Sequence, residues 1–132
     1  MRKTVLLNSN ISSVISRMGH TDQLTIGDCG LPIPAGVERI DLALKLGVPA
    51  FLETLDTVLD ELCVEKIILA EEIRSVSPEM HAAILARFSE RVAVEYVPHT
   101  EFKLATANSR AVVRTGECTA YANVILCSGV TF

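Results

Sequence analysis

Hydrophobic residues recur along the chain at two spacings, one typical of helices and the other of buried strands. Apolar residues three and four positions apart predict helices over residues 10–18, 48–62, 78–88 and 100–107. Alternating or continuous apolar runs predict strands over residues 23–27, 39–44, 65–70, 91–97, 111–115 and 123–127. Because strands and helices alternate, the pattern predicts an α/β protein with a largely parallel sheet, built as a single three-layer α/β/α domain over residues 1–132.

The segment from Ser77 has the features of a helix start. The Ser77 hydroxyl suits the N-cap, Pro78 the first helical position and Glu79 the first turn. The core-facing stripe of this helix is expected at Met80, Ala83, Ile84 and Phe88. His81 falls beside that stripe, so we expect it at the surface.

The composition is aliphatic for a chain of this length. Of 132 residues, 49% are hydrophobic but only 5% are aromatic, and the mean hydropathy is +0.37. Apolar stretches such as 67–70 are too short for a membrane-spanning helix, and the N-terminus lacks the apolar run of a signal peptide. The surplus apolar surface predicts contact with other subunits, with Ile11, Val14 and residues 130–132 as the expected interface positions.

Charge and cysteine spacing exclude several partners. Twelve basic and sixteen acidic residues give a net charge of −4, and the basic residues are not clustered as nucleic-acid binding requires. No glycine-rich phosphate-binding motif or zinc-ligand spacing is present, so we expect no cofactor and no metal. Without a C-x-x-C pair or an export signal, the cysteines are expected to be free thiols in the cytoplasm. They are Cys29, Cys63, Cys118 and Cys127.

Polar residues follow several predicted strands, where ligands usually bind in α/β sheets. They are Asp28, Glu71, Glu72, His99 and Glu117, with Tyr121 in the loop that follows. The sequence therefore predicts a polar site at one edge of the sheet.

His20 lies just past the first predicted helix, whose C-terminal dipole favours a protonated imidazole. Asp22 and Asp28 are close to it in sequence, and this setting suits a proton donor that works near pH 7. Plainer interpretations stay open: His20 as a solvated side chain, Asp28 as the cap of a turn, and Glu71 with Glu72 as a solvated loop start. From the residues alone, the sequence indicates an acidic, oligomeric α/β protein with a His/Asp site.

Five stretches of the chain carry a more specific pattern. They are LNSNISSVISRMGHTD (7–22), DCGLPIP (28–34), RID (39–41), RTGECTAYAN (114–123) and GVTF (129–132). In order and spacing they resemble the D-ribose pyranase family across essentially the whole chain. The segment 54–95 diverges most from the family pattern.

The resemblance implies an enzyme that interconverts β-D-ribopyranose and β-D-ribofuranose through the open-chain form, so that a kinase receives its preferred ring form. It implies His20 as the proton donor. The implied sugar contacts, some of them through the main chain, are Asp28, His99, Tyr121, Ala122 and Asn123. It also implies a homo-oligomer, a decamer of two pentameric rings with the D-ribose site at a subunit interface.

Three other functions stay open at this point. A related L-fucose mutarotase shares a Gly-His near the N-terminus and a similar ending, although residues 31–34 and 39–41 favour ribose. A non-catalytic sugar-binding accessory of ribose uptake would bind the sugar without accelerating ring exchange. Metal-dependent hydrolysis would use His20, Asp28 and His99 together, although their spacing is poor for a metal site.

Overall fold

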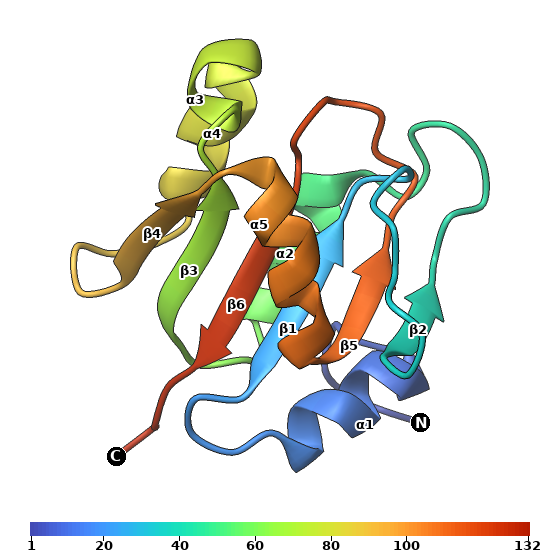
Figure 1. The fold of residues 1–132 in the computed structure, drawn as a ribbon. Coiled ribbons are helices and arrows are strands. Elements are labelled where there is room, and N and C mark those ends of the chain that lie inside the picture. The colour runs from blue at the N-terminus through green and yellow to red at the C-terminus, as the bar shows by residue number, and fades with distance from the viewer.

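Six strands pair into one mixed sheet in the computed structural model, which describes residues 1–132 (Figure 1). The strands are β1 (Gln23–Gly27), β2 (Glu38–Asp41), β3 (Val64–Ala70), β4 (Ala93–Val97), β5 (Ser109–Arg114) and β6 (Val124–Ser128). Their spatial order is β2-β5-β1-β6-β3-β4. Every pairing is parallel except the two that β6 makes with β1 and β3. The predicted, largely parallel sheet is therefore confirmed.

Helices cover both faces of this sheet. They are α1 (Ser9–Arg17), α2 (Phe51–Leu59), α3 (Ile73–Val76), α4 (Pro78–Leu85) and α5 (His99–Ala105), the last followed by a 3-10 turn (Thr106–Asn108). In Figure 1, α5 lies in front of the sheet and α2 behind it. The predicted three-layer α/β/α arrangement is confirmed.

Two hydrophobic clusters hold the layers together, one on each face. The larger has 19 buried residues and joins the sheet to α1, α2 and α4, for example through Val14, Leu55 and Ile84. The smaller has six and joins the other face to α5 and the loop after β1, through Phe102 and Leu31. Burying each such side chain contributes about 1.5–3 kcal/mol, so most of the packing energy lies on the α2 face.

The region from Ser77 differs from the prediction in three respects. Helix α3 was not predicted, and it leads directly into α4 at Pro78. The Ser77 hydroxyl does not cap α4 but donates to the Ala120 carbonyl oxygen at 2.7 Å, which ties α4 to the distant 115–123 loop. His81 is half-buried rather than exposed, because its Nε2 lies 2.7 Å from the Tyr96 hydroxyl oxygen.

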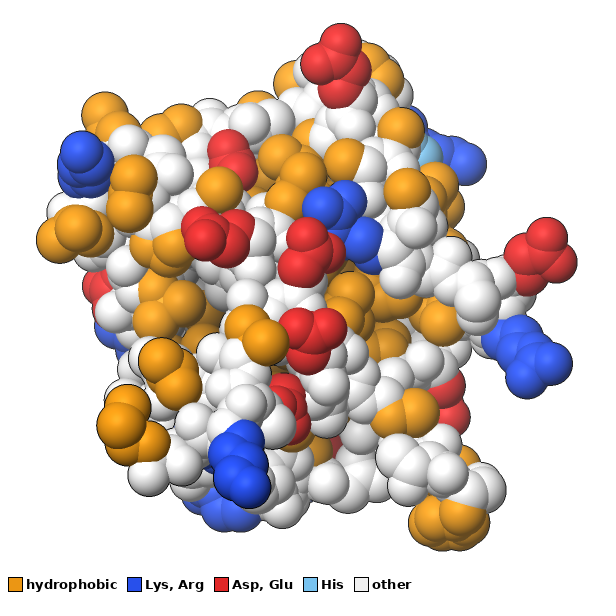
Figure 2. Space-filling model, turned by 180° about the vertical axis from the view of Figure 1, so that it is seen from behind, with side chains coloured by type: hydrophobic (Ala, Val, Ile, Leu, Met, Phe, Trp, Pro, Cys, Tyr) orange, Lys and Arg blue, Asp and Glu red, His pale blue; other side chains and the backbone are white.

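The expected interface positions divide into two groups. Ile11 and Val14 are each only 2% exposed and belong to the chain's own core, so that expectation was wrong for them. Val130 and Phe132 are exposed and stay candidates. Figure 2 shows other apolar side chains spread over the back face, with acidic side chains between them. None of the helices has the length and hydropathy that crossing a membrane would require.

The strand directions decide where a site can form. Because β1 to β5 run the same way and β6 runs against them, five strands end and one begins at the same edge. This edge is the upper one in Figure 1, where the 115–123 loop stands. The segment before β1 and the C-terminus lie at the opposite edge.

Candidate active site

The upper edge of the sheet gathers the polar residues that follow its strands. Asp28 follows β1, Glu72 lies two residues past β3, His99 begins α5 just after β4, and Asn123 directly precedes β6. The carboxyl edge of parallel strands is the usual ligand site of α/β sheets. We treat this group as the candidate active site.

Asp28 and Asn123 form a reciprocal pair in the centre of the site. The Asn123 Nδ2 donates to Asp28 Oδ2 at 2.9 Å, and the Asp28 amide donates to Asn123 Oδ1 at 2.8 Å. The other carboxylate oxygen accepts the Gly30 amide at 2.9 Å. Gly27 makes this approach possible, because a Cβ there would lie 3.0 Å from Asn123 Oδ1 and 2.6 Å from Leu31 Cδ2. The orientation of the Asp28 carboxylate is thus fixed by the fold.

His99 stands beside this pair at the start of α5. Its amide donates to both carboxylate oxygens of Glu72, each at 3.0 Å, so Glu72 anchors the beginning of the helix. The imidazole packs edge-on against Tyr121, with 5.0 Å between ring centroids, and stacks on Phe102 at 6.1 Å. Its Nδ1 is buried and has no hydrogen-bond partner. A buried polar atom of this kind is a natural contact for a ligand hydroxyl.

The surroundings of His99 favour a neutral ring. Burial lowers the pKa of His99 from its ordinary 6.5, and the Lys103 ammonium lowers it further. The carboxylates of Glu72 and Asp28 act in the opposite direction but do not outweigh these two effects. A neutral imidazole can accept or donate a hydrogen bond at either nitrogen, depending on its tautomer.

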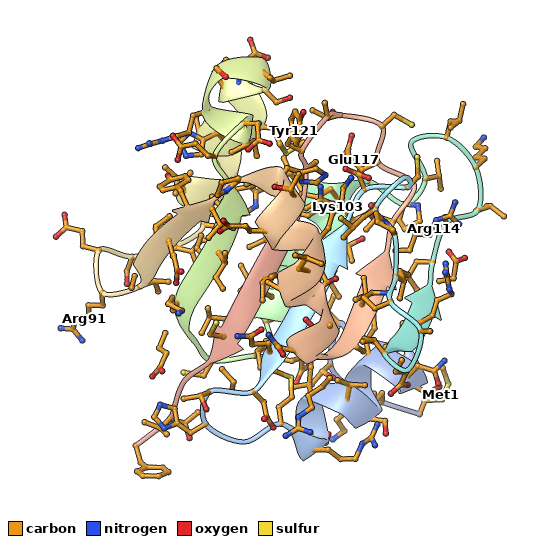
Figure 3. The ribbon with its side chains drawn as sticks, viewed as in Figure 1. Met1, Arg91, Lys103, Arg114, Glu117 and Tyr121 are labelled. Atoms are coloured by element: carbon orange, nitrogen blue, oxygen red, sulfur yellow. The ribbon has the colours of Figure 1, made fainter.

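Tyr121 and Ala122 come from the 115–123 loop. Tyr121 has a φ of 62°, a left-handed conformation that is uncommon for a bulky side chain and often found at functional sites. Figure 3 shows it at the top of the sheet, near Glu117 and above Lys103. The Ala122 side chain is fully buried in the core, so Ala122 can reach a ligand only through its backbone.

Glu117 fixes the loop that carries Tyr121. One carboxylate oxygen accepts the Phe51 amide, at the start of α2, at 3.0 Å. The other accepts the Thr119 hydroxyl at 2.9 Å and the amides of Cys118 and Thr119 at 3.2 and 3.3 Å. Burial alone would raise the pKa of Glu117, but these hydrogen bonds lower it below its usual range. Glu117 is therefore an ionised anchor of the loop.

His20 lies at the opposite edge of the sheet. It precedes β1, whereas Asp28 follows it, and five residues of strand separate the two ends by about 16 Å. Its side chain is 53% exposed, and its Nε2 lies 2.9 Å from Glu65 Oε2. Neither aspartate near it in sequence is its partner, since Asp22 pairs with Arg110 at 2.8 Å. Within one chain, His20 does not meet the candidate site.

The structure brings together most of the predicted sugar contacts but not His20. Asp28, His99, Tyr121 and Asn123 are brought together, and Ala122 lies among them. Glu72 is one of the polar residues expected after a strand, and its contact with the His99 amide shows that it is not merely part of a solvated loop. The contact of Glu65 with His20 is not predicted by any local pattern. The chain gathers no group of three or more histidine, cysteine, aspartate or glutamate side chains able to hold a metal ion.

Comparisons with known proteins identify relatives that span the whole chain. The family model described as the RbsD / FucU transport protein family matches residues 1–131. D-ribose pyranase of Clostridium perfringens is 58% identical over 132 residues, covering 100% of both chains. The solved structure of Bacillus subtilis RbsD complexed with D-ribose has a TM-score of 0.95 and 47% identity, also over 100% of both chains.

A more distant structure shares only the fold. The fucose mutarotase of Streptococcus pneumoniae, solved with L-fucose, has a TM-score of 0.77 and 21% identity over 96% of this chain and 95% of its own. The full-length family match and the high identity to the Clostridium protein decide the assignment. This chain belongs to the RbsD / FucU family.

Proposed function

We propose that this chain is a D-ribose pyranase, an isomerase that interconverts β-D-ribopyranose and β-D-ribofuranose. The observation that carries the proposal is the full-length, 58% identity to a D-ribose pyranase. The D-ribose complex of the Bacillus relative supports the same sugar. The fucose alternative rests on a relative at 21% identity, which supports the fold alone.

The reaction requires proton transfer and no redox step. The pyranose opens when a proton reaches the ring oxygen and another leaves the anomeric hydroxyl, which gives the open-chain aldehyde. The furanose closes when the C4 hydroxyl, instead of the C5 hydroxyl, attacks the same carbonyl carbon. General acid–base catalysis of such a step typically contributes about 10²–10⁴-fold.

The residues at the upper edge suit the sugar-binding part of this task. Asp28 is oriented by Asn123 and Gly30 and can accept a hydrogen bond from a sugar hydroxyl. The neutral ring of His99 can contact a second hydroxyl through its unpartnered Nδ1. The sugar contacts we propose are Asp28 and His99, together with Tyr121, the Ala122 backbone and Asn123.

The proton donor in this proposal is His20 of a second copy of the chain. Within one chain it lies about 16 Å from Asp28, which is too far for both residues to act on the same sugar. It is exposed, and Glu65 is placed to orient its ring, as carboxylates commonly do for catalytic histidines. A head-to-tail contact, in which one copy's lower edge meets the next copy's upper edge, forms a ring when the rotation between successive copies closes.

The assembly we propose is a decamer of two pentameric rings. Val130 and Phe132 are exposed near the C-terminus, at the same edge of the sheet as His20, and are candidates for this contact. The four cysteines are free, which fits the reducing cytoplasm as the proposed location. All 132 residues would act as one domain, since strands from both ends of the chain share a single sheet.

NMR saturation transfer between the ring forms of D-ribose tests the function. The wild-type protein should accelerate exchange, and His20→Ala should reduce that acceleration by about 10²–10⁴-fold while sugar binding is retained. Asp28→Asn should weaken binding, and Asp60→Asn, at an exposed helix end, serves as the matched control. Saturable ribose binding with no accelerated exchange would instead establish the accessory function. Faster exchange of L-fucose than of D-ribose would establish the fucose mutarotase.

A further inference from the structure

Two cysteine thiols meet beside the candidate site although they are 89 residues apart in sequence. The Sγ atoms of Cys29 and Cys118 are 4.0 Å apart. Cys29 directly follows Asp28, and Cys118 directly follows the loop anchor Glu117. The Cys29 amide donates to the Glu117 carbonyl oxygen at 2.9 Å, so the backbone itself holds the two cysteines side by side.

The pair is well placed for oxidation, and the other two cysteines are not. A disulfide bond is about 2.05 Å long, so the two sulfur atoms must approach by about 2 Å. Cys118 is exposed and Cys29 is half-buried, so an oxidant can reach the pair from solvent. Cys127 is buried, and the Cys63 thiol donates to the Val130 carbonyl oxygen at 3.3 Å instead of facing another thiol.

From this geometry we infer that Cys29 and Cys118 form a reversible disulfide that regulates the site. The oxidant is a low-molecular-weight disulfide, RSSR. The Cys118 thiolate attacks one of its sulfur atoms, which forms a mixed disulfide and releases one RSH after protonation. The Cys29 thiolate then attacks the Cys118 sulfur and releases the second RSH. Two cysteine thiols are oxidised, and one RSSR is reduced to two RSH.

The environment of the two thiols sets this order. Burial raises the pKa of Cys29, and the neighbouring Cys118 raises it further. Because thiolates are the nucleophiles in exchange, the exposed Cys118 reacts first and Cys29 completes the bond. Intracellular disulfides of this kind are usually transient and redox-sensing rather than structural.

The disulfide would act on the site through Asp28. Cys29 lies between Asp28 and Gly30, whose amide holds the Asp28 carboxylate at 2.9 Å. We expect the bond to draw Cys29 toward the 115–123 loop and so to shift this carboxylate relative to its hydrogen-bond partners. A misplacement of about 1 Å can cost about 10²-fold in rate. This consequence for activity rests on the proposed function, whereas formation of the disulfide does not.

The test treats the full-length protein with oxidised glutathione and follows mass and ribose exchange in parallel. We expect a loss of two hydrogens from the monomer, mapped by peptide mass spectrometry to Cys29 and Cys118. Exchange should fall by about tenfold or more and recover with dithiothreitol. Cys118→Ser and Cys29→Ser should each abolish the mass change, and reduced Cys118→Ser should keep wild-type exchange. Cys63→Ser is the matched control and should oxidise as the wild type does.

The outcomes separate the two claims. The proposed Cys29–Cys118 disulfide would be overturned if the oxidised protein carried a mixed glutathione adduct alone. A disulfide that uses Cys63 or Cys127 would overturn it as well. A Cys29–Cys118 bond that leaves ribose exchange unchanged would overturn its regulatory role. If the reduced protein shows no ribose exchange, the proposed function fails, and ribose affinity in the two redox states then decides whether the disulfide acts on the site.

Discussion

Replacing Glu117 with glutamine removes one charge from the loop that carries Tyr121. The glutamine oxygen can still accept the Phe51 amide at the start of α2. Its NH₂ group, however, replaces the oxygen that accepts from the amides of Cys118 and Thr119. Two backbone donors then face another donor.

The magnitude of the destabilisation follows from these contacts. Hydrogen bonds to a charged group contribute about 1.5–3 kcal/mol each, and the exposed side of the loop allows water to replace part of that. A negative charge at a helix N-terminus contributes about 0.3–1 kcal/mol more. We therefore expect Glu117→Gln to lower the free energy of unfolding by about 2–4 kcal/mol.

Urea denaturation at one fixed protein concentration measures this change, because oligomers make stability concentration-dependent. Glu53→Gln is the matched control, since Glu53 lies in the first turn of the same helix but is exposed, and it should cost about 0.3–1 kcal/mol. The contribution of the Glu117 carboxylate to the free energy of unfolding is complete above its ordinary pKa of 4.5. It is lost as pH falls through the lowered pKa of Glu117 in the folded state. The difference in free energy of unfolding between wild type and Glu117→Gln should therefore narrow as pH falls below the ordinary pKa of 4.5. A Glu117→Gln variant no less stable than Glu53→Gln would refute the anchoring role.

Two further predictions concern packing and protonation. Gly116→Ala should destabilise the protein by about 3 kcal/mol or more, because the alanine Cβ would lie 2.4 Å from the backbone N and O of Val48. Gly19→Ala is the control, since the nearest atom to a Cβ at that position is 3.9 Å away. Equal unfolding midpoints for the two variants would contradict this prediction. In an NMR pH titration His99 should show a pKa below its ordinary 6.5, because burial and the Lys103 ammonium both disfavour the charged ring. Lys103→Gln should raise that pKa toward the ordinary value, and an unchanged titration would show that Lys103 does not act on the ring.

Local patterns predicted the strands well because strand periodicity is set by the residues themselves. The strand at 23–27 has the predicted bounds, and all six predicted strands are present. The second strand ends at Asp41 rather than residue 44, because Asp41 Oδ1 accepts the Ala43 amide at 3.0 Å and turns the chain. The reversed direction of β6 was not predicted, since periodicity is the same in either direction.

The candidate site was predictable only as far as strand ends determine it. Asp28 and His99 follow strands that end at the same edge, so their proximity follows from the α/β pattern. Asn123 precedes β6 and lies at this edge only because β6 is antiparallel. The contact of Glu72 with the His99 amide joins residues 27 apart, and that of Glu65 with His20 joins residues 45 apart. Contacts over such separations depend on tertiary packing, which no local pattern encodes. Nearness in sequence was also misleading for His20 and Asp28, because a strand runs between them.

Mixing two impaired variants, at a ribose concentration too low for Asp28→Asn to bind the sugar appreciably, tests the shared site most directly. His20→Ala subunits keep Asp28, and Asp28→Asn subunits keep His20, so a mixed oligomer rebuilds a complete site wherever the two meet in the right order. With random mixing in equal amounts, about one site in four is complete, because each intact residue is present with a chance of about one half. Ribose exchange in co-refolded mixtures should therefore rise to about a quarter of the wild-type rate. Mixtures that stay at the level of the separate variants at every ratio would contradict a site built from two copies.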